Sequence, residues 1–195
     1  MFRTTKMAAA VVAAGVILLA GCSGGNHDMS DMDHGSASAK PNGNHNSADV
    51  EFATMMIPHH QQALEMAELA GERASNPEVK KLAGKIEKAQ DPEIKLMSGW
   101  LRGWGEPVPS PGMMGGHDMP GLMSDQDMKA LEKASGEDFD RMFLEMMIRH
   151  HQGAVDMAET ELKEGKDPAV RKLAKSIATS QTAEIGQMRN LLDSI

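Results

Sequence analysis

One stretch decides the fold because the chain contains it twice. Residues 55–68 read MMIPHHQQALEMAE, and residues 146–159 read MMIRHHQGAVDMAE. A shift of 91 residues aligns the two copies, and the match continues without a gap over about 50 residues, as expected of an internal duplication. The chain therefore contains two related halves.

Each half contains two helical patterns separated by a short break. In the first, apolar residues recur every three or four positions across residues 52–70, which is the spacing of one helix face. The second opens with a capping residue followed by proline, at Asn76-Pro77 and at Asp167-Pro168. No stretch sustains an alternation of period two. We therefore predict an all-α fold, a four-helix bundle of two duplicated helical hairpins over residues 48–195.

The two hairpins are separated by a segment of different composition. We expect the first at residues 48–102 and the second at residues 135–195, with a capping box at Ser135. The connector, residues 103–134, is rich in methionine, glycine and proline, which predicts a long loop. A short helix is expected at its end, from Ser124 to Ala134.

The first residues have the features of an export signal. Two basic residues precede an apolar run that is shorter than the about 20 residues a spanning helix needs. The segment LAGC that ends at Cys22 resembles a bacterial lipoprotein cleavage box. We predict a lipoprotein signal peptide at residues 1–21, a lipid anchor at Cys22 and a disordered tether at residues 22–47. The protein would then be exported and held at the outer face of the cell membrane or in the periplasm.

Composition narrows the possible ligands. The net charge is −8, and loss of the signal with its two basic residues lowers it to −10, which argues against binding nucleic acid through its phosphates. Cys22 is the only cysteine, so neither an intrachain disulfide nor a cluster of thiolates can form. Methionine is abundant, with 18 residues. A site for a soft metal would therefore use thioethers.

The duplicated histidines fall on the apolar faces of their helices. On a helical wheel, His59 and His150 lie near the middle of each face, and His60 and His151 lie at its edge. Adjacent histidines point apart on a helix, so we expect ligands to be shared between helices. Met56 precedes His59 by three positions, close enough for the two side chains to meet.

The residue types favour a soft ion over iron. A di-iron bundle needs Glu-x-x-His motifs, but methionine or isoleucine stands three positions before each histidine. Acidic residues near the motifs fall on the opposite face. Thioether with imidazole suits Cu(I), and Ag(I) is a plausible mimic. The alternative is that the methionines only fill the core and that the histidines are structural.

Two segments outside the helices favour the metal hypothesis, because they have no core to fill. The tether contains HDMSDMDH, and the connector contains MMGGHDM. We expect both to capture metal ions, through His27, Met29, Met32 and His34 in the tether and through Met113, Met114, His117 and Met119 in the connector.

The second helix of each half has two polar residues on its otherwise apolar face, which makes four in all. Because a metal-bound imidazole often donates its other N–H to a carboxylate, Glu93 and Glu184 are candidates to orient histidines of the neighbouring helices. Hydrogen bonds between helices without any metal are the alternative. The full candidate set for this supporting role is Gln90, Glu93, Gln181 and Glu184.

The motifs FATMMIPHHQQALEMAE and FDRMFLEMMIRHHQGAVDMAE, with QDPEIKLM and QTAEIGQM, resemble the DUF305 family of ferritin-like helical domains. The resemblance covers about residues 48–195, and it implies a four-helix bundle with a role in copper binding or resistance. By motif match, the implied metal ligands are Met55, Met56, His59, His60, Met66, Met146, Met147, His150, His151 and Met157.

These observations lead to one functional hypothesis and two alternatives. The leading hypothesis is an extracytoplasmic protein that is not an enzyme and that sequesters or transfers copper, preferably Cu(I), with Cu(II) or Ag(I) also possible. Its partners would be the metal ion, the membrane through Cys22 and another copper-handling protein. The alternatives are a ferritin-like cuprous oxidase, and a helical module that binds a protein partner.

Overall fold

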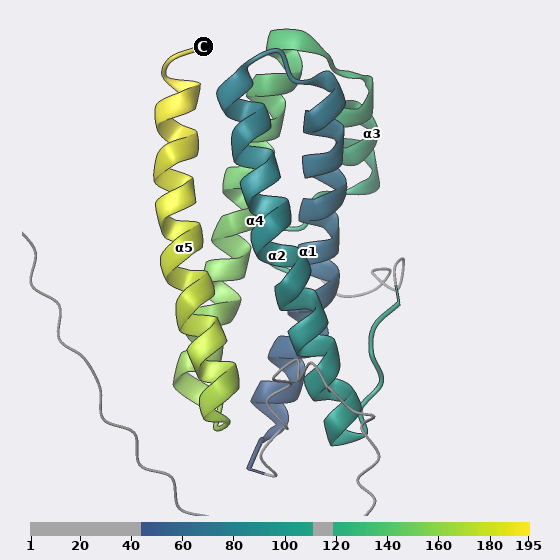
Figure 1. The fold of residues 1–195 in the computed structure, drawn as a ribbon, viewed down its shortest axis with the longest axis vertical. Coiled ribbons are helices and arrows are strands. Elements are labelled where there is room, and N and C mark those ends of the chain that lie inside the picture. The colour runs from purple at the N-terminus through teal and green to yellow at the C-terminus, as the bar shows by residue number, and fades with distance from the viewer. Residues whose placement is uncertain (1–43, 111–118) are drawn as a thin grey trace, which may run out of the picture. The chain divides into compact units, whose positions relative to one another are not determined.

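The computed structural model describes residues 44–110 and 119–195, and in these ranges the chain forms five helices and no sheet. They are α1 (Ser47–Arg73), α2 (Pro77–Trp104), α3 (Asp125–Lys133), α4 (Gly136–Glu164) and α5 (Pro168–Leu192). The four long helices form two hairpins, α1 with α2 and α4 with α5, which pack together through α1 and α4 (Figure 1). The all-α fold of two helical hairpins is confirmed.

Most helix boundaries follow the capping signals in the sequence. Asn76 and Asp167 accept hydrogen bonds from the first turns of α2 and α5, and proline is the first residue of each helix. Helix α1 begins at Ser47, one residue earlier than predicted, and α2 continues two residues beyond position 102. The short helix α3 lies where the connector was expected to end.

The predicted capping box at Ser135 is wrong. Ser135 precedes α4 but its side chain makes no capping hydrogen bond. Gly136, the first residue of α4, has a left-handed φ of 65°, so the first turn departs from the regular geometry that a capping box requires. Capping boxes occur instead at Asn46 with Asp49 and at Ser124 with Asp127.

Pro58 lies inside α1, at the position where the second copy has Arg149. An interior proline removes one helix hydrogen bond, at a cost of about 3 kcal/mol or more. Helix α2 also contains an interior proline, Pro92. The helix nevertheless continues on both sides of Pro58, so Met55 and Met56 share a helix with the histidine pair.

The apolar core consists of two clusters, which we call the Phe52 cluster and the Phe143 cluster after one buried phenylalanine in each. The 91-residue shift that aligns the halves also exchanges the clusters. The Phe52 cluster contains Met56, Met97 and Met157, and the Phe143 cluster contains their equivalents Met147, Met188 and Met66. The two hairpins are therefore packed with an approximate twofold symmetry.

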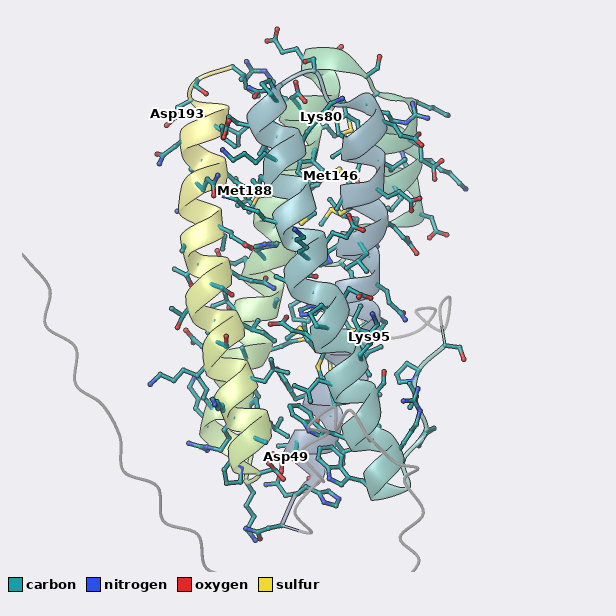
Figure 2. All side chains as sticks on the ribbon, viewed as in Figure 1. Asp49, Lys80, Lys95, Met146, Met188 and Asp193 are labelled. Atoms are coloured by element: carbon teal, nitrogen blue, oxygen red, sulfur yellow. The ribbon has the colours of Figure 1, made fainter. Side chains whose placement is uncertain are left out.

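Two buried aspartates tie the hairpins together in the same reciprocal way. Asp140 of α4 accepts backbone N–H groups of Ser75 and Asn76 in the α1–α2 turn. Its equivalent Asp49, in α1, accepts those of Lys166 and Asp167 in the α4–α5 turn. Figure 2 labels Asp49 at the end of the bundle where α1 begins. Each hairpin thus satisfies the turn of the other, which fixes the pairing of α1 with α4.

Within residues 44–110 and 119–195, no helix is both long enough and apolar enough to cross a membrane. The predicted signal peptide, the lipidation site Cys22 and nearly all of the predicted tether lie outside the described residues.

Candidate metal centre

A polar layer separates the two apolar clusters at the same level in all four long helices. In α1, for example, the Phe52 cluster ends at Ile57 and the Phe143 cluster begins at Ala63. The residues between the clusters include the histidines, glutamines and glutamates that the sequence singled out. The polar layer consists of His59, His60, Gln90, Glu93, His150, His151, Gln181 and Glu184.

The inner histidines, His59 and His150, meet across α1 and α4. Their ring centroids are 3.7 Å apart and the rings are tilted by 37°. Both side chains are fully buried. Burial lowers the pKa of His59 to about 3, with repulsion from His60 adding to the effect, and burial lowers the pKa of His150 well below its usual value. Both imidazoles are therefore neutral at physiological pH, which is the form that binds metals.

The inner histidines differ in their hydrogen bonds. His59 donates from Nε2 to the backbone oxygen of Pro120 at 3.2 Å, and its Nδ1 has no partner. Neither ring nitrogen of His150 has a hydrogen-bond partner of normal geometry, and the nearest polar group is the backbone of His59. A buried polar group without a partner lowers stability by about 1–3 kcal/mol, so a ligand bound to these nitrogens would remove an unfavourable term.

The outer histidines, His60 and His151, are held by carboxylates of the neighbouring helix. His60 Nε2 lies 2.8 Å from Glu93 Oε2, and His151 Nε2 lies 2.7 Å from Glu184 Oε2. Each carboxylate accepts a hydrogen bond from Nε2–H, so the lone pair of the neutral ring lies on Nδ1. Both histidines are fully buried, although the helical wheel placed them at the edge of the face.

The two glutamines of the layer are buried but do not contact the histidines by hydrogen bonds. Neither polar atom of the Gln90 side chain has a partner, and Gln181 Oε1 also has none. Glu93 and Glu184 therefore make the contacts expected of supporting residues, whereas Gln90 and Gln181 do not.

The candidate methionines lie on both sides of the layer. Met56 and Met157 are buried in the Phe52 cluster, with Met55 packed against it at the surface. The Phe143 cluster contains the other three, which are Met66, Met146 and Met147. Figure 2 labels Met146 in this part of the bundle. Each inner histidine thus has a thioether three positions earlier in its own helix, within a dry environment.

The connector covers one half of the layer. The Gln62 side chain pairs with the backbone of Met123, donating to its oxygen at 2.9 Å and accepting from its nitrogen at 2.8 Å. Gly153 lets the connector approach α4, since a Cβ there would lie 1.9 Å from the oxygen of Pro120. Gly121 has a φ of 80° and lies against the backbone of Arg149. This packing holds the Pro120 carbonyl at His59.

Sequence reasoning missed Gln62, Gly153 and Pro120. For Gln62 and Gly153 the signal was present, because the aligned halves place these two different residues opposite each other, as they do Pro58 and Arg149. The same alignment places Glu161 opposite Ala70. Glu161 is 1% exposed, and burial raises its pKa to about 8, with the charge of Asp49 adding to the effect.

In the described part of the chain, no three His, Cys, Asp or Glu side chains converge as a ready-made metal site. A centre built from the polar layer would therefore combine imidazole with thioether. Of the auxiliary candidates, only Met119 is described, and it lines a cavity together with Met55 and Pro58. The others, His27, Met29, Met32, His34, Met113, Met114 and His117, lie outside the described residues.

Solved structures of three similar proteins cover most of the chain. CopM in its Cu(II)-bound form is 43% identical, covering 75% of this chain and 96% of that one, with a TM-score of 0.67. CopM has also been solved with Cu(I), with silver and without metal. A DUF305 protein of Streptomyces coelicolor, named as secreted, is 36% identical, covers 76% and 93% of the two chains, and has a TM-score of 0.70. A DUF305 fragment of Deinococcus radiodurans is 34% identical, covers 77% of this chain and 98% of that one, and has a TM-score of 0.70.

Two further matches concern the sequence. Protein L153 of Acanthamoeba polyphaga mimivirus, described as uncharacterized, is 39% identical over 54 residues, which span 28% of this chain and 36% of that protein. The model of the family described as "Domain of unknown function (DUF305)" matches residues 49–192, which include all four long helices of the bundle except the first two residues of α1. The chain belongs to the DUF305 family.

Proposed function

We propose that this protein is an extracytoplasmic copper-binding protein, which sequesters or transfers Cu(I) and also accepts Ag(I) through histidine and methionine side chains. The observation that carries the proposal is the pair of inner histidines, which are neutral, buried and in contact, with three of their four ring nitrogens lacking a partner.

The donor set determines the kind of ion. Neutral imidazole nitrogens and thioether sulfurs are ligands for Cu(I) and Ag(I), and they carry no proton that must be displaced at physiological pH. Hard cations prefer oxygen ligands. The carboxylates of the layer are already paired with the outer histidines, so the inner pair offers only soft and borderline donors.

The remaining polar residues would orient the ligands. Glu93 and Glu184 fix the tautomer and the ring orientation of His60 and His151, which places both Nδ1 lone pairs on the buried side of the contact. The full set of proposed ligands is Met55, Met56, His59, His60, Met66, Met146, Met147, His150, His151 and Met157. A single ion takes only a few of these.

The similarity to CopM supports the choice of metal, because that protein has been solved with Cu(I), Cu(II) and silver bound. The named neighbours carry no enzyme's name, and we propose that the protein binds copper without converting it. Export, the lipid anchor at Cys22, metal capture by the tether and transfer to a partner protein belong to the same proposal. A Cys22→Ala variant that stays in the membrane fraction would contradict the anchor.

A competition titration tests the proposal. The full chain is titrated with Cu(I) against a chromophoric Cu(I) chelator under anaerobic conditions. We expect the His59→Leu/His150→Leu/Met56→Leu variant to lose the tightest class of sites, whereas Glu65→Gln, on the exposed face of α1, retains it. An unchanged affinity in the triple variant would contradict a site in the bundle.

The same preparation tests the non-enzymatic role. During aerobic incubation with Cu(I), Cu(II) should form no faster in the presence of the protein than in buffer alone. Catalytic turnover of Cu(I) would contradict the proposal and support a cuprous oxidase.

A further inference from the structure

A buried carboxyl group near the start of α1 has no counterpart in the other half of the bundle. Glu161 of α4 is 1% exposed, and no group donates a hydrogen bond to either of its carboxyl oxygens. Its neighbour Asp49 is satisfied, since it accepts backbone N–H groups of Asn46, Lys166 and Asp167. The two carboxyl groups therefore lie together with donors for only one of them.

The internal repeat shows that the chain makes room for this group. The residues equivalent to Glu161 and Gly165 are Ala70 and Ala74. A Cβ at Gly165 would lie 1.8 Å from Glu161 Oε1, so the carboxyl group occupies the space that the alanine methyl would take. A large buried carboxyl and a small glycine thus replace two alanines, and the pair is specific to the second half.

Glu161 also lines a cavity that contains two thioethers. The cavity has a volume of about 230 Å³ and lies between α1 and α4. Met157 precedes Glu161 by four positions, which places both on one face of α4. Met55 of α1 contributes to the same wall. The side chains of Glu161, Met55 and Met157 therefore line one small space, outside the polar layer.

The charges favour a cation in this space. Burial and the charge of Asp49 raise the pKa of Glu161 more than nearby Arg171 lowers it. A proton shared with Asp49 satisfies one Glu161 oxygen only. A bound cation would satisfy the carboxylate and the thioethers together, and two sulfur ligands select a soft cation over calcium or magnesium.

We propose that Glu161, Met55 and Met157 form a second site for a monovalent soft cation, Cu(I) or Ag(I), which is separate from the inner histidines. The proposal rests on the copper-binding function and adds a carboxylate ligand to it. Because Met55 is partly exposed while the four histidines of the polar layer are fully buried, this site is where an ion from solution first meets the bundle.

Silver binding to the full chain tests the second site. Ag(I) stoichiometry and affinity are measured by competition titration for the wild type, Glu161→Gln, Met55→Leu/Met157→Leu and the triple combination. We expect each of the first two variants to lose the same single equivalent of Ag(I), and the combination to lose no more than that. Extended X-ray absorption of the Cu(I)-loaded protein should lose an oxygen contribution in Glu161→Gln.

Matched controls separate this site from general effects. Glu159→Gln removes an exposed carboxylate of α4, and Met128→Leu removes a thioether remote from the cavity. Both should bind as the wild type does. Unchanged Ag(I) binding by Glu161→Gln, or an equal loss in the controls, would overturn the second site.

One further variant distinguishes failure of this proposal from failure of the copper-binding function. His59→Leu/His150→Leu should keep the equivalent that Glu161→Gln loses. If that variant alone loses an ion, the function stands and the second site is refuted. If the wild type binds Ag(I) no more tightly than a peptide of residues 22–47, the bundle binds no ion and both proposals fail.

Discussion

The two halves of the bundle hold their outer histidines alike and their inner histidines differently. His60 and His151 each contact a glutamate of the neighbouring helix, at 2.8 and 2.7 Å. His59 is bonded to the connector through Pro120, whereas His150 has no partner. The duplication therefore supplied two copies of one motif, and the connector made them unequal.

The inequality arises at a few positions of the aligned halves. Gln62, which holds the backbone of Met123, corresponds to Gly153, which makes space for Pro120. The residues common to both halves supply the histidines and glutamates of the layer. The residues that differ, Gln62 and Gly153, place the connector against His59 only. His150 is the more available ligand.

The largest predicted effect concerns what the inner histidines share, which is burial in the neutral form. Below pH 6.5 the unfolded chain takes up protons that folded His59 does not accept until about pH 3, so stability is lost as the pH falls through this window. His150, whose pKa is also lowered, acts in the same direction. At one pKa unit per 1.4 kcal/mol, the two residues account for at most about 5 kcal/mol between pH 6.5 and 4.5. Urea unfolding at both pH values measures the loss.

The variant that tests this prediction is His59→Leu/His150→Leu. Its free energy of unfolding should change less with pH than that of the wild type, whatever its absolute stability. Equal slopes for the two proteins would show that the inner histidines are not the groups that titrate.

The second effect comes from removing the side chain that holds the connector. Gln62→Ala would leave the backbone N–H and C=O of Met123 without partners, at a cost of about 3 kcal/mol. Chemical denaturation measures the change, with the exposed Gln152→Ala as the control, for which we expect almost none. A loss of stability as small as that of the control would mean that the connector is not held by Gln62.

A slightly smaller effect is expected from filling the space beside the connector. Gly153→Ala places a methyl group on the carbonyl of Pro120, and overpacking of this kind costs about 1–3 kcal/mol. Gly71→Ala, in α1 and free of contacts, should instead stabilise the protein by up to about 1 kcal/mol. Thermal unfolding of the two variants should therefore change in opposite directions, and a shift of the same sign in both would contradict the close approach.

The last effect, at Glu161, has a sign opposite to that of the histidines. The unfolded glutamate ionises near pH 4.5, but the folded one stays neutral until about pH 8, so stability is lost as the pH rises through this window. Glu161→Gln should be more stable than the wild type at pH 8 and equal to it at pH 4. Exposed Glu159→Gln should show no such difference, and a matching gain there would assign the effect to overall charge.

Much of the fold could be predicted from local signals. The 3.6-residue periodicity predicted the long helices, and the Asn76-Pro77 and Asp167-Pro168 pairs predicted where two of them begin. The prediction at Ser135 failed because a left-handed Gly136 changes the first turn, and that conformation depends on the surrounding packing.

The candidate site could be predicted only in part. Periodicity placed the histidines on a buried face, and the isolated acidic residues on apolar faces pointed to Glu93 and Glu184. The contact of His59 with Pro120 could not be predicted, because the connector has no periodic pattern that locates it on the bundle. Its docking depends on the shape of α4 at Gly153, which is a property of the folded chain.

The most direct test of the metal centre follows the histidine side chains individually. Long-range ¹H–¹⁵N spectra of the ¹⁵N-labelled full chain are recorded during titration with Ag(I). We predict that the ring nitrogens of His150 and His59 shift with the tightly bound equivalents, while the Nε2–H groups of His60 and His151 stay hydrogen-bonded to their glutamates. Shifts confined to His27, His34 and His117, with the ring nitrogens of His59 and His150 unchanged at saturation, would contradict a metal centre in the bundle.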